Sequence, residues 1–132
     1  MKNFSIILIE RNNYMKLLST YTYEIKKSKF IAYYYEINTV EEAKSILEEL
    51  RINNKKARHI PYAYILSNTA SKSDDKEPNN TAGLPLYNLL LHKNLNNVLI
   101  AVVRYFGGTK LGAGNLLRSY VEAGKMAIEK AS

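Results

Sequence analysis

Two adjoining runs decide the fold of this chain: Val98-Leu99-Ile100-Ala101-Val102-Val103-Arg104-Tyr105-Phe106 and, directly after it, Gly107-Gly108-Thr109-Lys110-Leu111-Gly112-Ala113-Gly114. The first run is the most apolar stretch of the chain and is rich in β-branched residues, which predicts a central strand buried on both faces. The second run holds four glycines and leads into a helical pattern that continues to about Lys130. A strand, a glycine-rich loop and a helix in this order predict an α/β domain.

Further strands are predicted from alternation upstream of this stretch. Residues 21–26 and 29–37 alternate and are rich in β-formers, with a bend near Lys27, so they predict two strands. Residues 60–66 predict another strand, and Pro61 indicates that it lies at a sheet edge or begins irregularly.

Helices are predicted where apolar residues recur at helical spacing. A helix over 40–53 follows a capping box formed by Thr39 and Glu42. The almost entirely polar residues 67–80 predict a long loop. A short helix then opens near Pro85, where the missing N–H costs little.

In the final helix, a shared face is predicted for Leu117, Tyr120, Val121 and Ile128, which recur at helical spacing. Gly124 inside this helix indicates close packing against a neighbouring element.

The length of the chain suits one packed domain. It has 132 residues, of which 46% are hydrophobic and 23% charged, close to ordinary globular usage. We expect residues 21–132 to form the domain and residues 1–20 to be a peripheral N-terminal extension. Residues 1–14 show no clear period, and Met15 offers a second start.

Several classes of protein are disfavoured by what the sequence lacks. There is no cysteine, so a disulfide scaffold, a thiolate zinc site and a thiol nucleophile are excluded. The apolar run at 4–9 is too short for a membrane helix and poorly shaped for a secretory signal. We therefore expect a cytoplasmic location and no membrane partner.

The formal net charge is +7 and the pI is near 9.5, which favours anionic partners such as RNA or single-stranded DNA. Coding bias toward Lys, Asn, Ile and Tyr is the alternative explanation. The charge is spread rather than gathered in a tail, since residues 1–60 carry 11 basic and 7 acidic groups and residues 61–132 carry 8 and 5.

The glycine-rich loop is the strongest candidate binding site. Free backbone N–H groups and the dipole of the following helix can be aimed at an anion, phosphate above all. The alternative is that the glycines only permit tight turns and close packing. The predicted anion site comprises Arg104, Gly107, Gly108, Lys110, Gly112, Gly114 and Arg118.

A second candidate is a polar site formed by His59, Asp74, Asp75 and Glu77. Clustered carboxylates can hold Mg²⁺ or supply a base, but acidic loops are more often solvated or ion-paired. We expect this turn to be an ion-paired structural element, and we expect no metal, no cofactor and no catalytic residue.

Several blocks of the sequence resemble the YigZ/IMPACT family, and the resemblance covers about residues 21–131 of this chain. In order, they are Lys27-Ser28-Lys29-Phe30-Ile31-Ala32, Ala57-Arg58-His59, Ala63-Tyr64, Ser73-Asp74-Asp75 with Glu77-Pro78, Thr81-Ala82-Gly83 with Pro85, and Val102 to Gly114 with Leu116, Arg118 and Tyr120.

This resemblance implies an α/β (α+β) fold similar to domain 2 of ribosomal protein S5, also seen in domain IV of translocating elongation factors. We expect a two-layer sandwich, with a mixed or antiparallel sheet and helices on one face. Full-length bacterial relatives carry a further ferredoxin-like domain, which we expect to be absent here. Two residues depart from the family pattern, because Lys76 and Asn115 stand where glycine is usual.

The resemblance also bears on function. The eukaryotic relative restrains a starvation-activated translation-initiation kinase by competing for its activator. For this chain the resemblance implies a non-catalytic binding module, which acts either in translation-linked regulation or by binding nucleic acid or phosphate. The expected partner is RNA, single-stranded DNA or a translation-associated protein. One alternative is an enzyme acting on a phosphorylated small molecule through His59, Asp74, Asp75, Arg104 and Lys110. A pure protein-interaction domain is another, and the sequence gives no oligomeric state.

Overall fold

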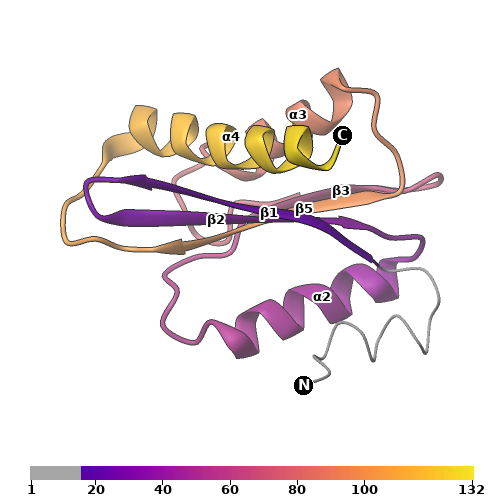
Figure 1. The fold of residues 1–132 in the computed structure, drawn as a ribbon, viewed down its shortest axis with the longest axis horizontal. Helices are drawn as coiled ribbons and strands as arrows, with labels where there is room; N and C mark the ends of the chain where they lie inside the picture. Colours follow the sequence, from indigo (N-terminus) through magenta and orange to yellow (C-terminus); the bar gives the residue numbers. More distant parts are fainter. Residues whose placement is uncertain (1–15) are drawn as a thin grey trace.

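A five-stranded sheet lies between helices on its two faces in the computed structural model, which describes residues 16–132 (Figure 1). The elements, in chain order, are β1 (Lys16–Ile25), β2 (Ser28–Glu36), α2 (Val40–Asn53), β3 (Tyr62–Ile65), β4 (Ala70–Ser73), α3 (Gly83–His92), β5 (Val98–Tyr105) and α4 (Gly112–Ala131).

The sheet has the strand order β1-β2-β5-β3-β4, and every pairing is antiparallel. The predicted α+β class with an antiparallel sheet is confirmed. β5 lies in the middle and is buried along all but its last residue, as its continuous apolar run predicts.

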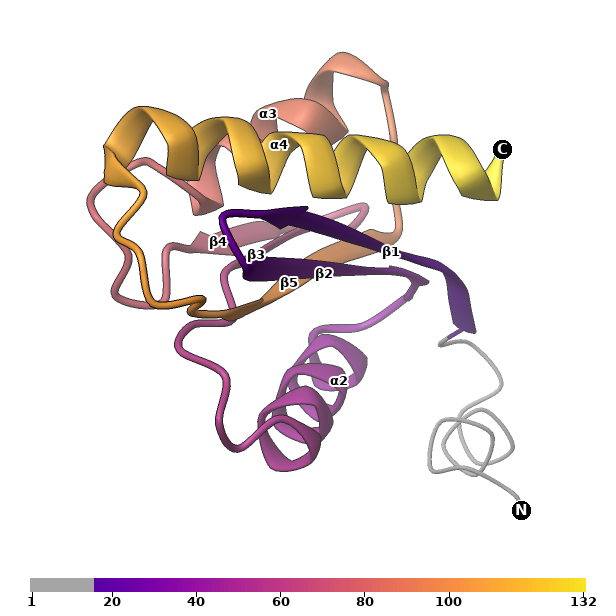
Figure 2. The same cartoon turned by 60° about the vertical axis from the view of Figure 1, so that its left-hand side comes forward.

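The helices cover both faces of the sheet, which corrects the expectation of a two-layer sandwich with helices on one face. Figure 2 shows α3 and α4 on one side of the sheet and α2 on the other. The reason is the double-sided burial of β5, whose side chains alternate between the faces. Ile100 and Val102 pack with α3 and α4, and Leu99 and Val103 pack with α2.

The first strand begins earlier than expected. Residues 16–20, which we expected in a peripheral extension, belong to β1 and pair with the end of β2 from Lys16 opposite Glu36 onward. The Ser19 hydroxyl also donates a hydrogen bond to the carbonyl of Ala127 in α4. Residues 1–15 of the expected extension lie outside the described residues.

Two strands differ from the sequence pattern. β3 lies inside the sheet between β5 and β4, so the edge position suggested by Pro61 is wrong. The irregular start is not borne out either, because the bridge of His59 with Arg104 keeps the register in which Tyr62 pairs with Ala101, and the Pro61 carbonyl accepts a hydrogen bond from the N–H of Val102. The segment 67–80, predicted as loop, contains β4, a short polar edge strand paired with β3.

The helices form close to where the sequence predicts them. α2 has the expected bounds, and the capping box of Thr39 and Glu42 is present. In α4, Leu117 is 39% exposed, so the predicted face is wrong at this position; the buried residues include Leu116 and Tyr120.

Gly124 of α4 faces α3, and a Cβ there would lie 2.9 Å from Cδ2 of Leu86. This confirms the predicted close packing. Among the described residues, no helix is long and apolar enough to cross a membrane.

Candidate functional site

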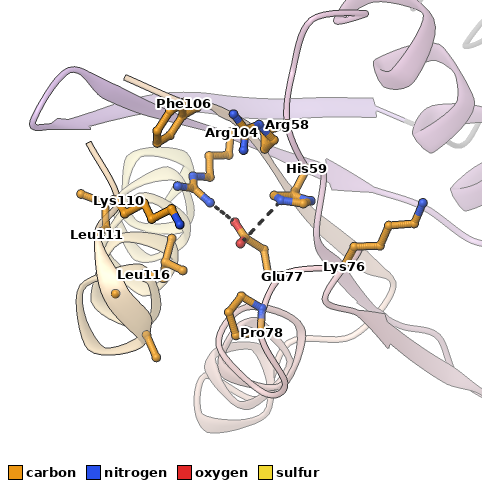
Figure 3. Close-up of a pocket in the computed structure, with 12 residues that line it drawn as sticks. Arg58, His59, Lys76, Glu77, Pro78, Arg104, Phe106, Lys110, Leu111 and Leu116 are labelled. Atoms are coloured by element: carbon orange, nitrogen blue, oxygen red, sulfur yellow. Dashed lines mark hydrogen bonds and ion pairs between the residues drawn. The ribbon is translucent and has the colours of Figure 1, made fainter. Parts of the chain in front are cut away.

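A cavity of about 500 Å³ opens at one end of the sheet, where β5 ends and α4 begins (Figure 3). The segment before β3 and the loop before α3 complete its walls. We call it the β5–α4 pocket. Its lining residues are Arg58, His59, Lys76, Glu77, Pro78, Arg104, Phe106, Lys110, Leu111, Gly112, Ala113 and Leu116.

A buried ion pair forms the inner wall of the pocket. Nη1 of Arg104 lies 2.7 Å from Oε2 of Glu77, and the two side chains are 7% and 3% exposed. The Tyr120 hydroxyl donates a hydrogen bond to the same carboxylate oxygen. Burial, and then the Glu77 carboxylate, raise the pKa of Tyr120 well above its usual range, so the phenol stays a donor.

This ion pair satisfies only part of the hydrogen-bonding capacity of the Arg104 guanidinium. Its Nε has no hydrogen-bond acceptor among residues 16–132, although it is buried. Arg104 was predicted as part of the anion site at the glycine loop. It lines the pocket as a buried residue paired with Glu77, which enters the same space from the loop before α3.

The His59 side chain bridges Asp75 and Glu77. Its Nδ1 lies 2.7 Å from the carbonyl oxygen of Asp75, and since a carbonyl only accepts, Nδ1 must carry the proton of this bond. Nε2 then faces Oε1 of Glu77 at 3.7 Å, too far for a hydrogen bond.

The carboxylate of Asp74 holds the start of α3. Its Oδ1 accepts from the N–H groups of Ala82 (3.1 Å) and Gly83 (2.8 Å), and its Oδ2 accepts from Asn80 (2.9 Å). Partial burial acts to raise the pKa of Asp74, but these three donors and the charge of Lys72 outweigh it, so the pKa lies below its usual value.

The Asp75 carboxylate is likewise occupied, because Oδ2 accepts from the N–H of Ile60 at 2.6 Å. Neither Asp74 nor Asp75 lines the β5–α4 pocket. In the part of the chain that the structure describes, no three His, Asp or Glu side chains are grouped so as to hold a metal ion.

The glycines of the predicted anion site have different roles. A Cβ on Gly107 would lie 2.2 Å from the carbonyl carbon of Lys27, so this glycine permits close packing of the loop on the β1–β2 turn. Gly108 and Gly112 have φ of 99° and 81°, which favours glycine. Of the four glycines, Gly112 lines the pocket, whereas Gly107, Gly108 and Gly114 do not.

Arg118 lies away from the pocket. Its guanidinium donates to Oδ1 of Asn115 on the same exposed side of α4, and it lines a separate hollow with Tyr23. The predicted anion site is therefore brought together only in part: Arg104, Lys110 and Gly112 line the pocket, and the predicted polar residues His59 and Glu77 join them.

The sequence did not single out Arg58, Lys76 and Phe106 as site residues. The guanidinium of Arg58 lies over the ring of Phe106, 4.5 Å from its centroid. Both residues stand next to predicted ones, Arg58 before His59 and Phe106 before the glycine loop. Only the approach of the two segments in space shows that they pair.

The first turn of α4 lines this pocket with Gly112 and Ala113. The N-cap is Leu111, which makes no side-chain cap, and the turn contains no acidic residue. The first N–H groups of a helix lack intrahelical partners. Of the described residues, Glu77 is the only acidic one that lines the pocket, and Arg104 neutralises it.

The family model described as "Impact N-terminal domain" matches residues 26–128. The chain belongs to this family. As an Impact N-terminal domain it is 38% identical to the IMPACT family member YigZ of Escherichia coli over 74% of its length and 50% of the relative's. It is 36% identical to YvyE of Bacillus subtilis, over 73% of this chain and 46% of that protein. It thus spans about half the length of these relatives.

Solved structures share the fold of this Impact N-terminal domain. The crystal structure of a hypothetical protein matches with a TM-score of 0.82 and 33% identity, over 89% of this chain and 60% of the other. The two-domain translational regulator Yih1 matches with a TM-score of 0.54 and 24% identity, over 89% of this chain and 46% of that one. At this identity, the likeness to Yih1 concerns the fold alone.

Proposed function

We propose that this Impact N-terminal domain is a non-catalytic binding module whose β5–α4 pocket takes a phosphate group of RNA or single-stranded DNA. One observation carries the proposal. The uncapped first turn of α4 opens on a pocket lined by the exposed cations Arg58, Lys76 and Lys110, while the pocket's carboxylate, Glu77, is already neutralised.

Phosphate is the anion that suits this arrangement. The backbone N–H groups at the start of α4 and the positive end of the helix dipole favour a compact, multiply charged oxyanion. Lys110 stands just before the helix and is exposed, so its ammonium group can reach the same anion. Gly112 leaves the approach open, since a Cβ there would have no neighbour within 4 Å.

A nucleic acid is favoured over other phosphate carriers because an aromatic surface adjoins the pocket. Phe106 is 36% exposed and is overlaid by the planar guanidinium of Arg58. Exposed aromatic rings and arginine planes are the surfaces on which unpaired bases stack. The net charge of +7 acts in the same direction.

A binding role is favoured over catalysis because the candidate catalytic groups are engaged. Asp74 and Asp75 accept hydrogen bonds from backbone N–H groups, and Glu77 is paired with Arg104. His59 is anchored through Nδ1. We extend the proposal to translation-linked regulation because Yih1 is described as a translational regulator; co-sedimentation with ribosomes tests this part.

The test is fluorescence anisotropy with a labelled oligouridine of about 12 nucleotides, at about 50 mM and about 150 mM salt. We expect binding that weakens steeply with salt. Lys110→Ala is expected to lower the affinity about 5-fold or more, while Lys125→Ala, an exposed lysine far along the same helix, leaves it near the parent value.

Two results would contradict the proposal. The nucleic-acid assignment falls if the parent protein shows no binding at the lower salt concentration. The pocket assignment falls if Lys110→Ala and Lys125→Ala bind alike. Cleavage of the oligonucleotide during the assay would favour the enzyme hypothesis instead.

A further inference from the structure

Lys76 has an unusual backbone conformation. It has φ of 71° and follows Asp75, whose φ is 45°. Two consecutive residues thus occupy the left-handed region, which glycine adopts freely and a lysine adopts only against steric strain. The N–H of Glu77 donates to the carbonyl of Asp74 at 3.0 Å and closes a four-residue turn with this pair at its centre. Turns of this type require a positive φ at both central residues.

The turn accounts for the backbone conformation of both residues, whereas their side chains differ. Asp75 is held by hydrogen bonds of its carboxylate and its carbonyl to Ile60 and His59. The carboxylate of Glu77 pairs with Arg104 and faces Nε2 of His59 at 3.7 Å, and Lys76 takes no part in these contacts. The lysine side chain is exposed and lines the pocket.

The cations of the pocket are also separated in space. Figure 3 shows Lys110 and Lys76 on opposite sides of Glu77, with Arg104 and His59 between them. Because Glu77 and Arg104 neutralise each other, the pocket has two positive ends and a neutral middle. A single phosphate bound at Lys110 and the start of α4 leaves Lys76 unused. A ligand with phosphates at both ends uses both cations.

We propose that Lys76 binds a second phosphate group, so that the ligand of the β5–α4 pocket is a nucleic-acid strand with successive phosphates rather than one nucleotide. This inference rests on the proposed function and names its ligand more closely. The strand enters at the first turn of α4, passes the exposed ring of Phe106 and leaves over Lys76.

The variant Lys76→Gly separates this role from a structural one. Glycine relieves the left-handed strain, so the melting temperature is expected to rise. The same change removes a phosphate contact, so the affinity for oligouridine of about 12 nucleotides is expected to fall about 5-fold at low salt. The salt dependence becomes shallower by about 0.7 in slope. A residue of purely structural importance would not weaken binding while stabilising the fold.

A second experiment compares the binding of ligands of different length. Binding of uridine monophosphate is expected to depend on Lys110 and not on Lys76, whereas the oligonucleotide depends on both. Lys76→Arg keeps the charge and is expected to keep the parent affinity. Adenosine triphosphate tests the alternative ligand, a single nucleotide that carries several phosphates. We expect it to bind more weakly than the oligonucleotide.

The outcomes separate the two proposals. If Lys110→Ala weakens oligonucleotide binding and Lys76→Gly does not, the second phosphate site is refuted and the proposed function stands. Triphosphate binding that matches the oligonucleotide and depends on Lys76 refutes the strand as the ligand. If the parent protein does not bind the oligonucleotide, both proposals are refuted.

Discussion

Arg104 in the central strand and Glu77 in the loop before α3 form an ion pair of 2.7 Å between side chains that are both nearly inaccessible to solvent. The pair joins segments 27 residues apart in sequence. Tyr120 of α4 donates to the same carboxylate, so three separate elements converge on one charged group.

Removing one charge of this pair is expected to destabilise the fold strongly. Glu77→Gln leaves Arg104 as an uncompensated buried cation, which costs about 3 kcal/mol in the free energy of unfolding. Urea denaturation measures the loss, and Glu48→Gln, an exposed position on α2, serves as control. If the two variants unfold at the same urea concentration, the pair does not stabilise the fold.

Asp74 is expected to make stability depend on pH in acid. Its pKa is lowered in the folded protein, so its contribution is complete above the unfolded value of about 3.9 and is lost as the pH falls through the folded value. The unfolding free energies of the parent and of Asp74→Asn should therefore differ near neutral pH and converge in strong acid. A difference that stays constant with pH would contradict this role.

Gly107 and Gly114 are expected to respond differently to alanine. At Gly107 the new Cβ would lie 2.2 Å from backbone atoms of the β1–β2 turn, so the loop must move, and we expect a loss of about 2 kcal/mol or more. At Gly114 the nearest atom belongs to the flexible Arg118 side chain at 3.6 Å. Gly114→Ala is therefore expected to be neutral or to stabilise by up to about 1 kcal/mol. Thermal melting compares the two, and equal losses would contradict the packing role of Gly107.

The acidic turn is expected not to bind divalent cations tightly. The carboxylates of Asp74, Asp75 and Glu77 already accept hydrogen bonds from backbone donors or pair with Arg104. Calorimetric titration with Mg²⁺ and Mn²⁺ should show no saturable heat below about millimolar concentration. Stoichiometric uptake that disappears in Asp75→Ala would overturn this prediction.

Local sequence signals predicted the fold well where one short segment carries all the information. The capping box of Thr39 and Glu42 defines the start of α2, and the apolar run, interrupted only by Arg104, predicted the central position of β5. β4 was missed because its four residues, Ala70–Ser73, include no β-branched or aromatic residue, and only pairing with β3 makes them a strand.

The candidate site was predicted less completely because it depends on contacts between distant segments. Lys110 and Gly112 were expected from the loop itself. The burial of Arg104 depends on Glu77, and the Arg58–Phe106 contact joins residues 48 positions apart. No pattern within either segment encodes such a pairing.

The position of β5 also has a kinetic consequence. Its alternating side chains belong to both hydrophobic cores, one under α3 and α4 and the other under α2. Its backbone is hydrogen-bonded to β2 on one side and to β3 on the other. Neither helix layer can detach without exposing the apolar surface of β5. The amide protons of β5 should therefore exchange with solvent deuterium only when the whole domain opens, and more slowly than those of β4.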